Sequence, residues 1–196
     1  MTSRATCAEC GIPTASYEAV EVTTDGGACR LLCSRCFNKE MAERAGLRRF
    51  EHPRFEPVRL HDADGVAHEF HFRTLLFGDD RLSLEAFELE SDGDPGGFKV
   101  HVLGDPNGDP FALLAKLVGK MRRLVSMKHV RNDSAGLQII DQTVRGRVEW
   151  DHVENANTPC VVVDGKRISW DDFGAMLMAF EGWQFKLELR DPGDEI

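Results

Sequence analysis

Four cysteines arranged as two close pairs are the residues of this chain whose type and spacing best suit chemistry. Cys7 and Cys10 form one Cys-x2-Cys pair, and Cys33 and Cys36 form a second pair after 22 intervening residues. Two residues between thiols allow a single turn of backbone to aim both sulfurs at the same ion. The four cysteines therefore predict one tetrahedral zinc ion per chain, with Zn–S bonds of about 2.3 Å.

A site with four thiolates leaves no coordination position for water or substrate, so the predicted zinc is structural. The same cysteines could also form a redox dithiol pair or hold an iron–sulfur cluster. Cys29 would lie about 13 Å from Cys33 along an extended strand, too far to share the ion. We expect Cys29 to be a small packing residue and Cys160 to be a core thiol.

A short hairpin and a helix are expected to position these cysteines. Residues alternate in polarity from Tyr17 to Thr24, a turn signal follows at 25–27, and the chain returns to Leu32, which predicts a β-hairpin. A helix is predicted from Asn38 to Ala45, with Gly46 at its C-terminal cap. A segment of this length buries too little apolar surface to fold alone, so metal binding is expected to stabilise it.

The order of knuckle CAECG, hairpin, and CSRCF leading into a helix resembles the treble-clef and zinc-ribbon group of zinc fingers, over residues 5–46. The resemblance implies zinc ligation by the four matching cysteines. It also implies a role in binding nucleic acid, binding protein, or dimerisation. The helix carries no nuclease-type histidine motif, so the resemblance does not extend to catalysis.

We expect three parts: a zinc-binding finger at 1–46, a linker or strap at 47–60, and an acidic α+β domain at 61–196. Pro53 and Pro57 favour extended backbone in the strap. The net charge of −9 is uneven, because residues 1–60 carry nine Lys/Arg and eight Asp/Glu whereas residues 61–196 carry 15 and 25. This balance argues against charge-driven binding of nucleic acid over the whole surface.

Hairpin signals dominate the third part and predict a mainly antiparallel sheet with two helices, and hence an α+β fold. Strands are predicted at 66–78, 81–90, 97–104, 137–152, 159–168 and 183–189. One helix should begin after Asp109 and run to about His129, with an apolar stripe of Leu114, Leu117, Val118, Met121 and Val125. The other should run from Ser169 to Gly182, with Trp170 and Trp183 as core anchors.

The first of these helices has a basic face. Its cations are Lys116, Lys120, Arg122 and Arg123, and residues 111–131 contain no acid. With Arg35 and Lys39 of the finger, they could contact an acidic partner or phosphates. The alternative is a solvated face, or one paired with acids at Asp79, Asp80, Glu85 and Glu88.

These patterns favour an intracellular, zinc-binding adaptor or regulatory protein that docks on another macromolecule, a protein first and a nucleic acid second. The alternative function is an enzyme whose pocket lies in the C-terminal domain, with the finger as a structural appendage. The polar stretch from Met1 to Cys10 lacks an export signal, and no apolar run reaches the roughly 20 residues of a membrane span. We therefore expect the cytoplasm and no membrane association.

Overall fold

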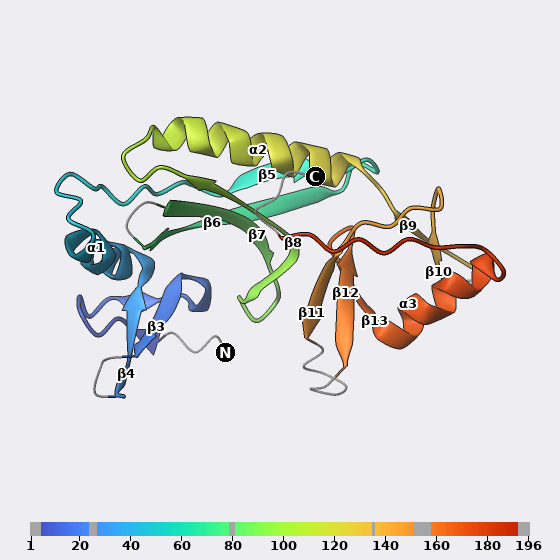
Figure 1. Ribbon diagram of the computed structural model, residues 1–196, viewed down its shortest axis with the longest axis horizontal. Helices are drawn as coiled ribbons and strands as arrows, with labels where there is room; N and C mark the ends of the chain where they lie inside the picture. The colour runs from blue at the N-terminus through green and yellow to red at the C-terminus, as the bar shows by residue number, and fades with distance from the viewer. Residues whose placement is uncertain (1–4, 24–26, 79–80, 135, 151–157, 192–196) are drawn as a thin grey trace.

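The computed structural model describes residues 5–23, 27–78, 81–134, 136–150 and 158–191. It is an α+β protein in which every strand pairing within these ranges is antiparallel, as predicted. Figure 1 shows a central sheet with a long helix above it, a small N-terminal unit below one end, and a second small sheet at the other end. Within the described residues, no helix is long and apolar enough to cross a membrane.

The N-terminal unit consists of short strands and one helix: β1 (Ala5–Thr6), β2 (Pro13–Thr14), the 3-10 helix η1 (Ser16–Glu18), β3 (Ala19–Thr23), β4 (Cys29–Cys33) and α1 (Ser34–Arg44). The predicted hairpin pairing is confirmed, because β3 pairs with β4 from Ala19 opposite Cys33 to Thr23 opposite Cys29. The first strand starts at Ala19 rather than at the predicted Tyr17, and residues 24–26 of the predicted turn lie outside the described residues. The predicted start of the helix at Asn38 was wrong. Cys33 is the N-cap and the helix begins at Ser34, which places Cys36 in its first turn.

Gly46 ends α1, as predicted, by adopting a φ of 70° that other residues rarely tolerate. The Gly46 N–H donates to the Glu43 carbonyl and the Leu47 N–H donates to the Ala42 carbonyl. This pair of bonds is a Schellman motif, which satisfies carbonyls that the end of a helix would leave unpaired.

The central sheet has the order β5–β6–β7–β8. Its strands are β5 (Val58–His61), β6 (Ala67–Phe77), β7 (Arg81–Leu89) and β8 (Pro95–Gly104), followed by helix α2 (Pro110–Ser126). The predicted cap of α2 is confirmed, because the Asp109 side chain accepts a hydrogen bond from the Phe111 N–H and Pro110 occupies the first turn. The helix ends three residues before the predicted His129, since Met127 is already extended.

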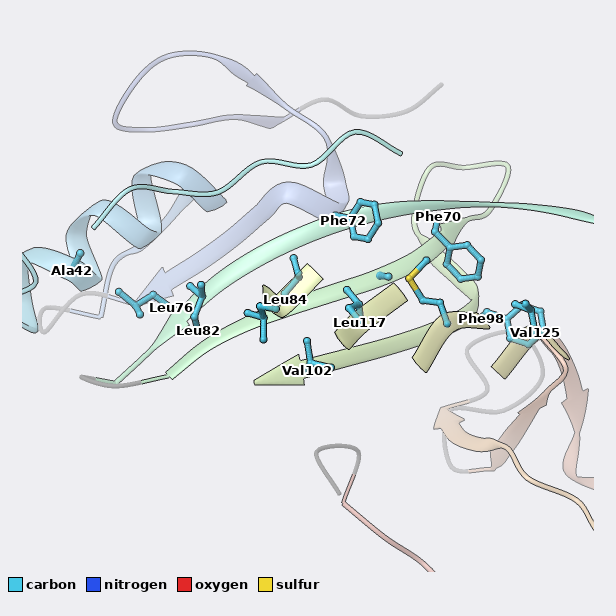
Figure 2. Packing of buried hydrophobic residues seen from close by; sticks show 13 residues of the cluster. Ala42, Phe70, Phe72, Leu76, Leu82, Leu84, Phe98, Val102, Leu117 and Val125 are labelled. Atoms are coloured by element: carbon cyan, nitrogen blue, oxygen red, sulfur yellow. The ribbon is translucent and has the colours of Figure 1, made fainter. Parts of the chain in front are cut away.

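The main hydrophobic core lies between this sheet and α2. Phe70, Leu84 and Val102 of three neighbouring strands cluster with Leu117 of the helix (Figure 2). The buried stripe of α2 contains Leu113 in place of the predicted Leu114. The Leu113 side chain packs directly over Gly104, so closely that a Cβ at position 104 would collide with it. Leu114 and Val118 are only partly buried.

The C-terminal part has its own smaller core. It comprises β9 (Val130–Asp133), β10 (Gly136–Ile139), β11 (Arg147–Trp150), β12 (Pro159–Val163), β13 (Lys166–Ser169), α3 (Trp170–Leu177) and the 3-10 helix η2 (Met178–Phe180). The β12–β13 hairpin about Asp164-Gly165 is confirmed, as is the Ser169 cap of α3, whose hydroxyl accepts from the Asp172 N–H. Met176 of α3 clusters with Val161 and Ile168 of the sheet.

Three predictions for this part were wrong. The strand predicted at 137–152 is interrupted, because positive φ angles at Asp141 and Gln142 turn the chain between β10 and β11; residues 151 and 152 lie outside the described residues. Residues 183–189 form no strand, since no strand lies beside them in the described part of the chain. Trp170 and Trp183 are 47% and 60% exposed rather than core anchors.

Candidate metal centre

The four predicted cysteine ligands meet in one cluster. Cys7 and Cys10 come from the turn between β1 and β2, Cys33 ends β4, and Cys36 lies in the first turn of α1. Their sulfur atoms all lie within 4.8 Å of one another. Tetrahedral zinc with bonds of about 2.3 Å requires sulfurs roughly 3.8 Å apart, so small side-chain adjustments would close this cluster around one ion.

Backbone hydrogen bonds fix the turn that carries Cys7 and Cys10. The Gly11 N–H donates to the Cys7 carbonyl at 3.0 Å, and the Cys7 N–H donates to the Ile12 carbonyl at 3.1 Å. Gly11 has a φ of 70°, which lets the chain reverse directly after Cys10. A further bond from the Ala8 N–H to the Leu31 carbonyl ties this turn to β4 and so to Cys33.

The thiol pKa values within the cluster shift in opposite directions, lowered at Cys7 and raised at Cys33 and Cys36. Burial raises the pKa of the Cys7 thiol, but backbone N–H donors at Cys10 and Cys33 outweigh it and lower the pKa to about 6. Burial, together with the neighbouring sulfurs, raises the pKa of the Cys36 thiol. Four thiolates repel one another unless a cation neutralises them, so binding of a metal would release protons from the remaining thiols.

The two other cysteines lie outside this cluster. Cys29 is exposed at the start of β4, so its prediction as a packing residue was wrong. Cys160 is fully buried in β12, as predicted for a core thiol. All six cysteines are free thiols. This tetra-cysteine group could hold a metal ion, and its geometry is consistent with zinc.

The helix that carries Cys36 is fixed to the central sheet by Asn38, whose side chain is fully buried. Its Oδ1 accepts from the Leu76 N–H at 2.8 Å, and its Nδ2 donates to the Thr74 carbonyl at 2.8 Å. β5 pairs with β6 only at residues 67–70, so within the described part of the chain the side of β6 opposite β7 has no neighbouring strand at residues 74–76. The amide of Asn38 occupies that edge as a peptide group of another strand would.

The second N–H of the Asn38 amide donates to Nδ1 of His52, 2.8 Å away. This contact requires the neutral His52 tautomer with its proton on Nε2. Burial, followed by the nearby charges of Arg54 and Arg35, lowers the pKa of His52 to about 4. The buried junction between α1 and the sheet therefore depends on a histidine that stays neutral.

Acidification should weaken this junction. His52 has a folded pKa below its unfolded value of about 6.5, so its contribution to stability is complete above pH 6.5 and falls as the pH drops toward 4. With allowance for its partial exposure, we expect the zinc-loaded chain to lose about 1 kcal/mol of unfolding free energy between pH 7.5 and 5.5 from this group. Urea titrations at both pH values measure the loss.

The control for this prediction is His61→Gln, which removes an exposed histidine of β5 and should keep the wild-type difference between the two pH values. His52→Gln should reduce that difference. If His52→Gln and wild type lose the same stability on acidification, the pH dependence comes from other groups.

Aromatic contacts of Tyr17 and a hydrogen bond from Arg73 add to the junction. The Tyr17 ring lies 5.7 Å from the His71 ring and 5.6 Å from the Phe87 ring, centre to centre. Arg73 donates to the Tyr17 carbonyl at 3.1 Å and also pairs with Glu85 at 2.7 Å. The N-terminal unit is thus held to the sheet by these contacts as well as by those of Asn38.

The predicted basic residues lie on two separate helices. Arg35 and Lys39 are exposed on α1, where Lys39 pairs with Glu43 at 4.0 Å. The other four basic residues lie on α2: Lys116, Lys120, Arg122 and Arg123. In Figure 1, α2 lies over the sheet, whereas α1 lies below one end of it. The structure therefore does not bring the two groups together on one surface.

Two of the four acids expected to neutralise α2 have partners elsewhere. Glu85 pairs with Arg73, and Glu88 contacts His68 at 2.8 Å. Asp79 and Asp80 lie outside the described residues. Among the described residues, the four basic side chains of α2 make no ion pair; three of them are exposed and Lys120 is half-buried.

A cleft of about 400 Å³ lies between the strap, the start of β7 and the N-terminus of α2. Its described lining consists of Arg49, Glu51, Pro53, Leu82, Pro106, Asn107, Gly108 and Pro110. The described lining contains one carboxylate, Glu51, and no serine, cysteine, lysine or histidine. The enzyme alternative stays a prediction.

Sequence reasoning missed both Asn38 and His52 as functional positions. Asn38 was placed at the start of the helix, where asparagine is a common cap, and only the structure shows it buried. The available signal was that Asn38 lies four residues before Ala42, and hence on the same face of the helix as an apolar residue. His52 is brought to Asn38 by the path of the strap, which no local pattern reveals.

Three consecutive segments of the chain match families that are each described only as a domain of unknown function. Residues 6–48 match DUF7685, residues 51–126 match DUF7686, and residues 129–194 match DUF7713. No curated protein and no solved structure matches the chain.

Proposed function

We propose that this chain is a zinc-binding adaptor or regulatory protein that docks on another macromolecule. The observation that carries the proposal is the closed cluster of four cysteines on a unit that is fixed to a sheet. The knuckle, hairpin and helix resemble the treble-clef group of zinc fingers, whose members serve as binding modules. Zinc thiolates need reduced cysteines, which favours a reducing compartment such as the cytoplasm.

A structural role for the metal follows from the donor set. Four thiolates complete the coordination of zinc, so no position remains from which the ion could activate water. The zinc would instead hold the β1–β2 turn, the end of β4 and the start of α1 at one point. Its free energy of binding then becomes folding free energy for the unit.

The exposed face of α2 is the docking surface that we favour. Lys116, Lys120 and Arg123 recur at helical spacing, and they have no ionic partner within the described part of the chain. A cluster of like charges on a chain of net charge −9 is best neutralised by an acidic surface. We place an acidic protein first and a nucleic acid second, because the overall charge of the chain opposes phosphate binding.

Charge reversal on α2 tests this proposal. We expect Lys116→Glu/Arg123→Glu to lose protein partners that zinc-loaded wild type retains from extracts of its own cells at physiological salt. The matched control is Arg145→Glu/Lys166→Glu, which makes the same change in net charge at two exposed positions of the C-terminal part. Quantitative mass spectrometry of the retained proteins measures the loss, which should exceed about tenfold for a direct partner.

Two results would contradict this proposal. Equal retention by the two charge-reversal variants would show that α2 is not the docking face. Retention of DNA or RNA by wild type at low salt, with the loss confined to the α2 variant, would make the nucleic acid the partner and reverse our order.

A further inference from the structure

The segment after η2 has the sequence pattern of a strand but no strand partner in the described structure. Its apolar side chains alternate with polar ones from Trp183 to Arg190. Phe185, Leu187 and Leu189 are 90%, 72% and 76% exposed. A stretch of three strongly exposed apolar side chains on one side of an extended segment is costly in water, and pairing with a sheet edge would bury it.

Among the described residues, the small C-terminal sheet has an edge that no strand covers. Its order is β11–β12–β13, so β11 lies at one edge. Val148 and Trp150 of β11 are 58% and 63% exposed. Val148 lies opposite Val161, which packs beneath α3, so these two side chains continue the apolar face of the sheet beyond the area that α3 covers.

We propose that residues 185–188 of one copy pair antiparallel with β11 of a second copy. In the register that places Leu187 opposite Val148, Phe185 lies opposite Trp150 on the same apolar face. On the other face, Glu188 lies opposite Arg147 and Lys186 lies opposite Glu149. All four cross-strand pairs are then complementary, two apolar and two ionic.

The charges already present at β11 favour this register. Glu149 pairs with Lys99 at 2.9 Å, Arg147 at 2.8 Å and Arg167 at 3.3 Å. One carboxylate therefore serves three cations, and these positive charges lower its pKa although burial opposes them. Glu188 of the incoming strand would supply a second carboxylate to the cluster, beside Arg147.

The geometry of the chain favours a second copy over the chain's own β11. The chain reverses directly after η2, with the Trp183 N–H bonded to the Phe180 carbonyl at 3.0 Å and the two rings 5.5 Å apart. In Figure 1 the segment then runs back from the far end of α3 and crosses past one end of the small sheet instead of following β11.

Such pairing is reciprocal, so each copy donates one segment and accepts another about a two-fold axis. The two contacts would bury the exposed parts of Trp150, Phe185 and Leu187 in both copies. These aromatic and aliphatic side chains amount to a buried surface on the order of 1,000 Å², the lower range for a specific interface.

Light scattering coupled to gel filtration tests the proposal on the zinc-loaded full chain. We expect wild type at about 50 μM to have twice the mass of one chain. Leu187→Asp places a charge on the apolar face and should weaken dimerisation more than about a hundredfold. Gln184→Asp is the matched control, since it adds the same charge outside the four paired positions and should remain dimeric.

A disulfide experiment identifies which chains pair. Val148→Cys and Leu187→Cys are prepared as separate variants and mixed under mild oxidation, because directly opposed strand residues have Cα atoms close enough for a disulfide. We expect a bond between the two introduced cysteines, identified by peptide mass spectrometry, and much less when Gln184→Cys replaces Leu187→Cys.

Three results would overturn the inference. Wild type that has the mass of one chain at all concentrations would exclude the dimer. A dimer that Leu187→Asp leaves intact would place the interface elsewhere. A bond that forms only within a Val148→Cys/Leu187→Cys double variant, and not between the mixed single variants, would show that the segment pairs with its own sheet.

Discussion

Elemental analysis of the purified chain is expected to give one zinc per molecule, and Cys36→Ser is expected to lose it. Changes in the residues that support zinc ligands cost roughly 10–100-fold in affinity, so loss of a ligand should cost more. Structural zinc contributes about 10–16 kcal/mol in isolated fingers, and its loss should unfold the N-terminal unit. Competition with a chelator measures the affinity, and hydrogen exchange over residues 5–46 measures the unfolding.

The chain provides a matched control in Cys29→Ser. This change removes an exposed cysteine of β4 that lies outside the cluster, so zinc content and affinity should stay at the wild-type values. Serine at Cys7, Cys10 or Cys33 should behave like serine at Cys36. A metal-free wild type that remains folded would refute the zinc site, and iron in the elemental analysis would favour a cluster instead.

Among substitutions that leave the cysteines unchanged, Asn38→Ala should cause a large loss of stability. The substitution leaves the Leu76 N–H, the Thr74 carbonyl and His52 without their partner in a buried place. Each buried polar group left unpaired costs about 1–3 kcal/mol, so we expect a total of about 3–5 kcal/mol. Urea denaturation of the zinc-loaded chain at pH 7.5 measures the difference.

Asn132→Ala is the control for this change, because Asn132 is exposed in β9 and should alter stability by no more than about 0.5 kcal/mol. Zinc content should remain at one per chain in Asn38→Ala, since the four sulfurs are untouched. An Asn38→Ala variant as stable as wild type would mean that α1 does not rest on the edge of β6 in solution.

The fold was predictable where local chemistry decides it. The alternation of Ala67 to Phe77, the cap at Asp109 and the turn at Asp164 each predicted an element that the structure contains. The cysteine spacing predicted all four members of the cluster. The division at residues 46 and 60 stays a prediction, although β5 lies partly within the proposed strap and the C-terminal part contains a separate core.

The failures arose where contacts between distant residues decide the structure. Residues 183–189 alternate as a strand does, but a strand also needs a neighbour, and the sequence pattern does not supply one. Trp170 and Trp183 were assigned to the core because tryptophan usually is buried, whereas the short α3 covers only part of its sheet. The role of Asn38 depends on where β5 stops pairing with β6, which no local signal reports.

Cys36 and Asn38 lie on the same helix, so loss of the metal at Cys36 should also affect the strand edge that Asn38 covers. A strand edge with free N–H and carbonyl groups is a template on which another chain can add. In the zinc-bound chain, α1 keeps the edge of β6 at residues 74–76 covered. Removal of the metal would release α1 and uncover that edge beside the buried side chains of Leu75 and Leu76, so the apo chain should form β-rich aggregates that the zinc-bound chain does not.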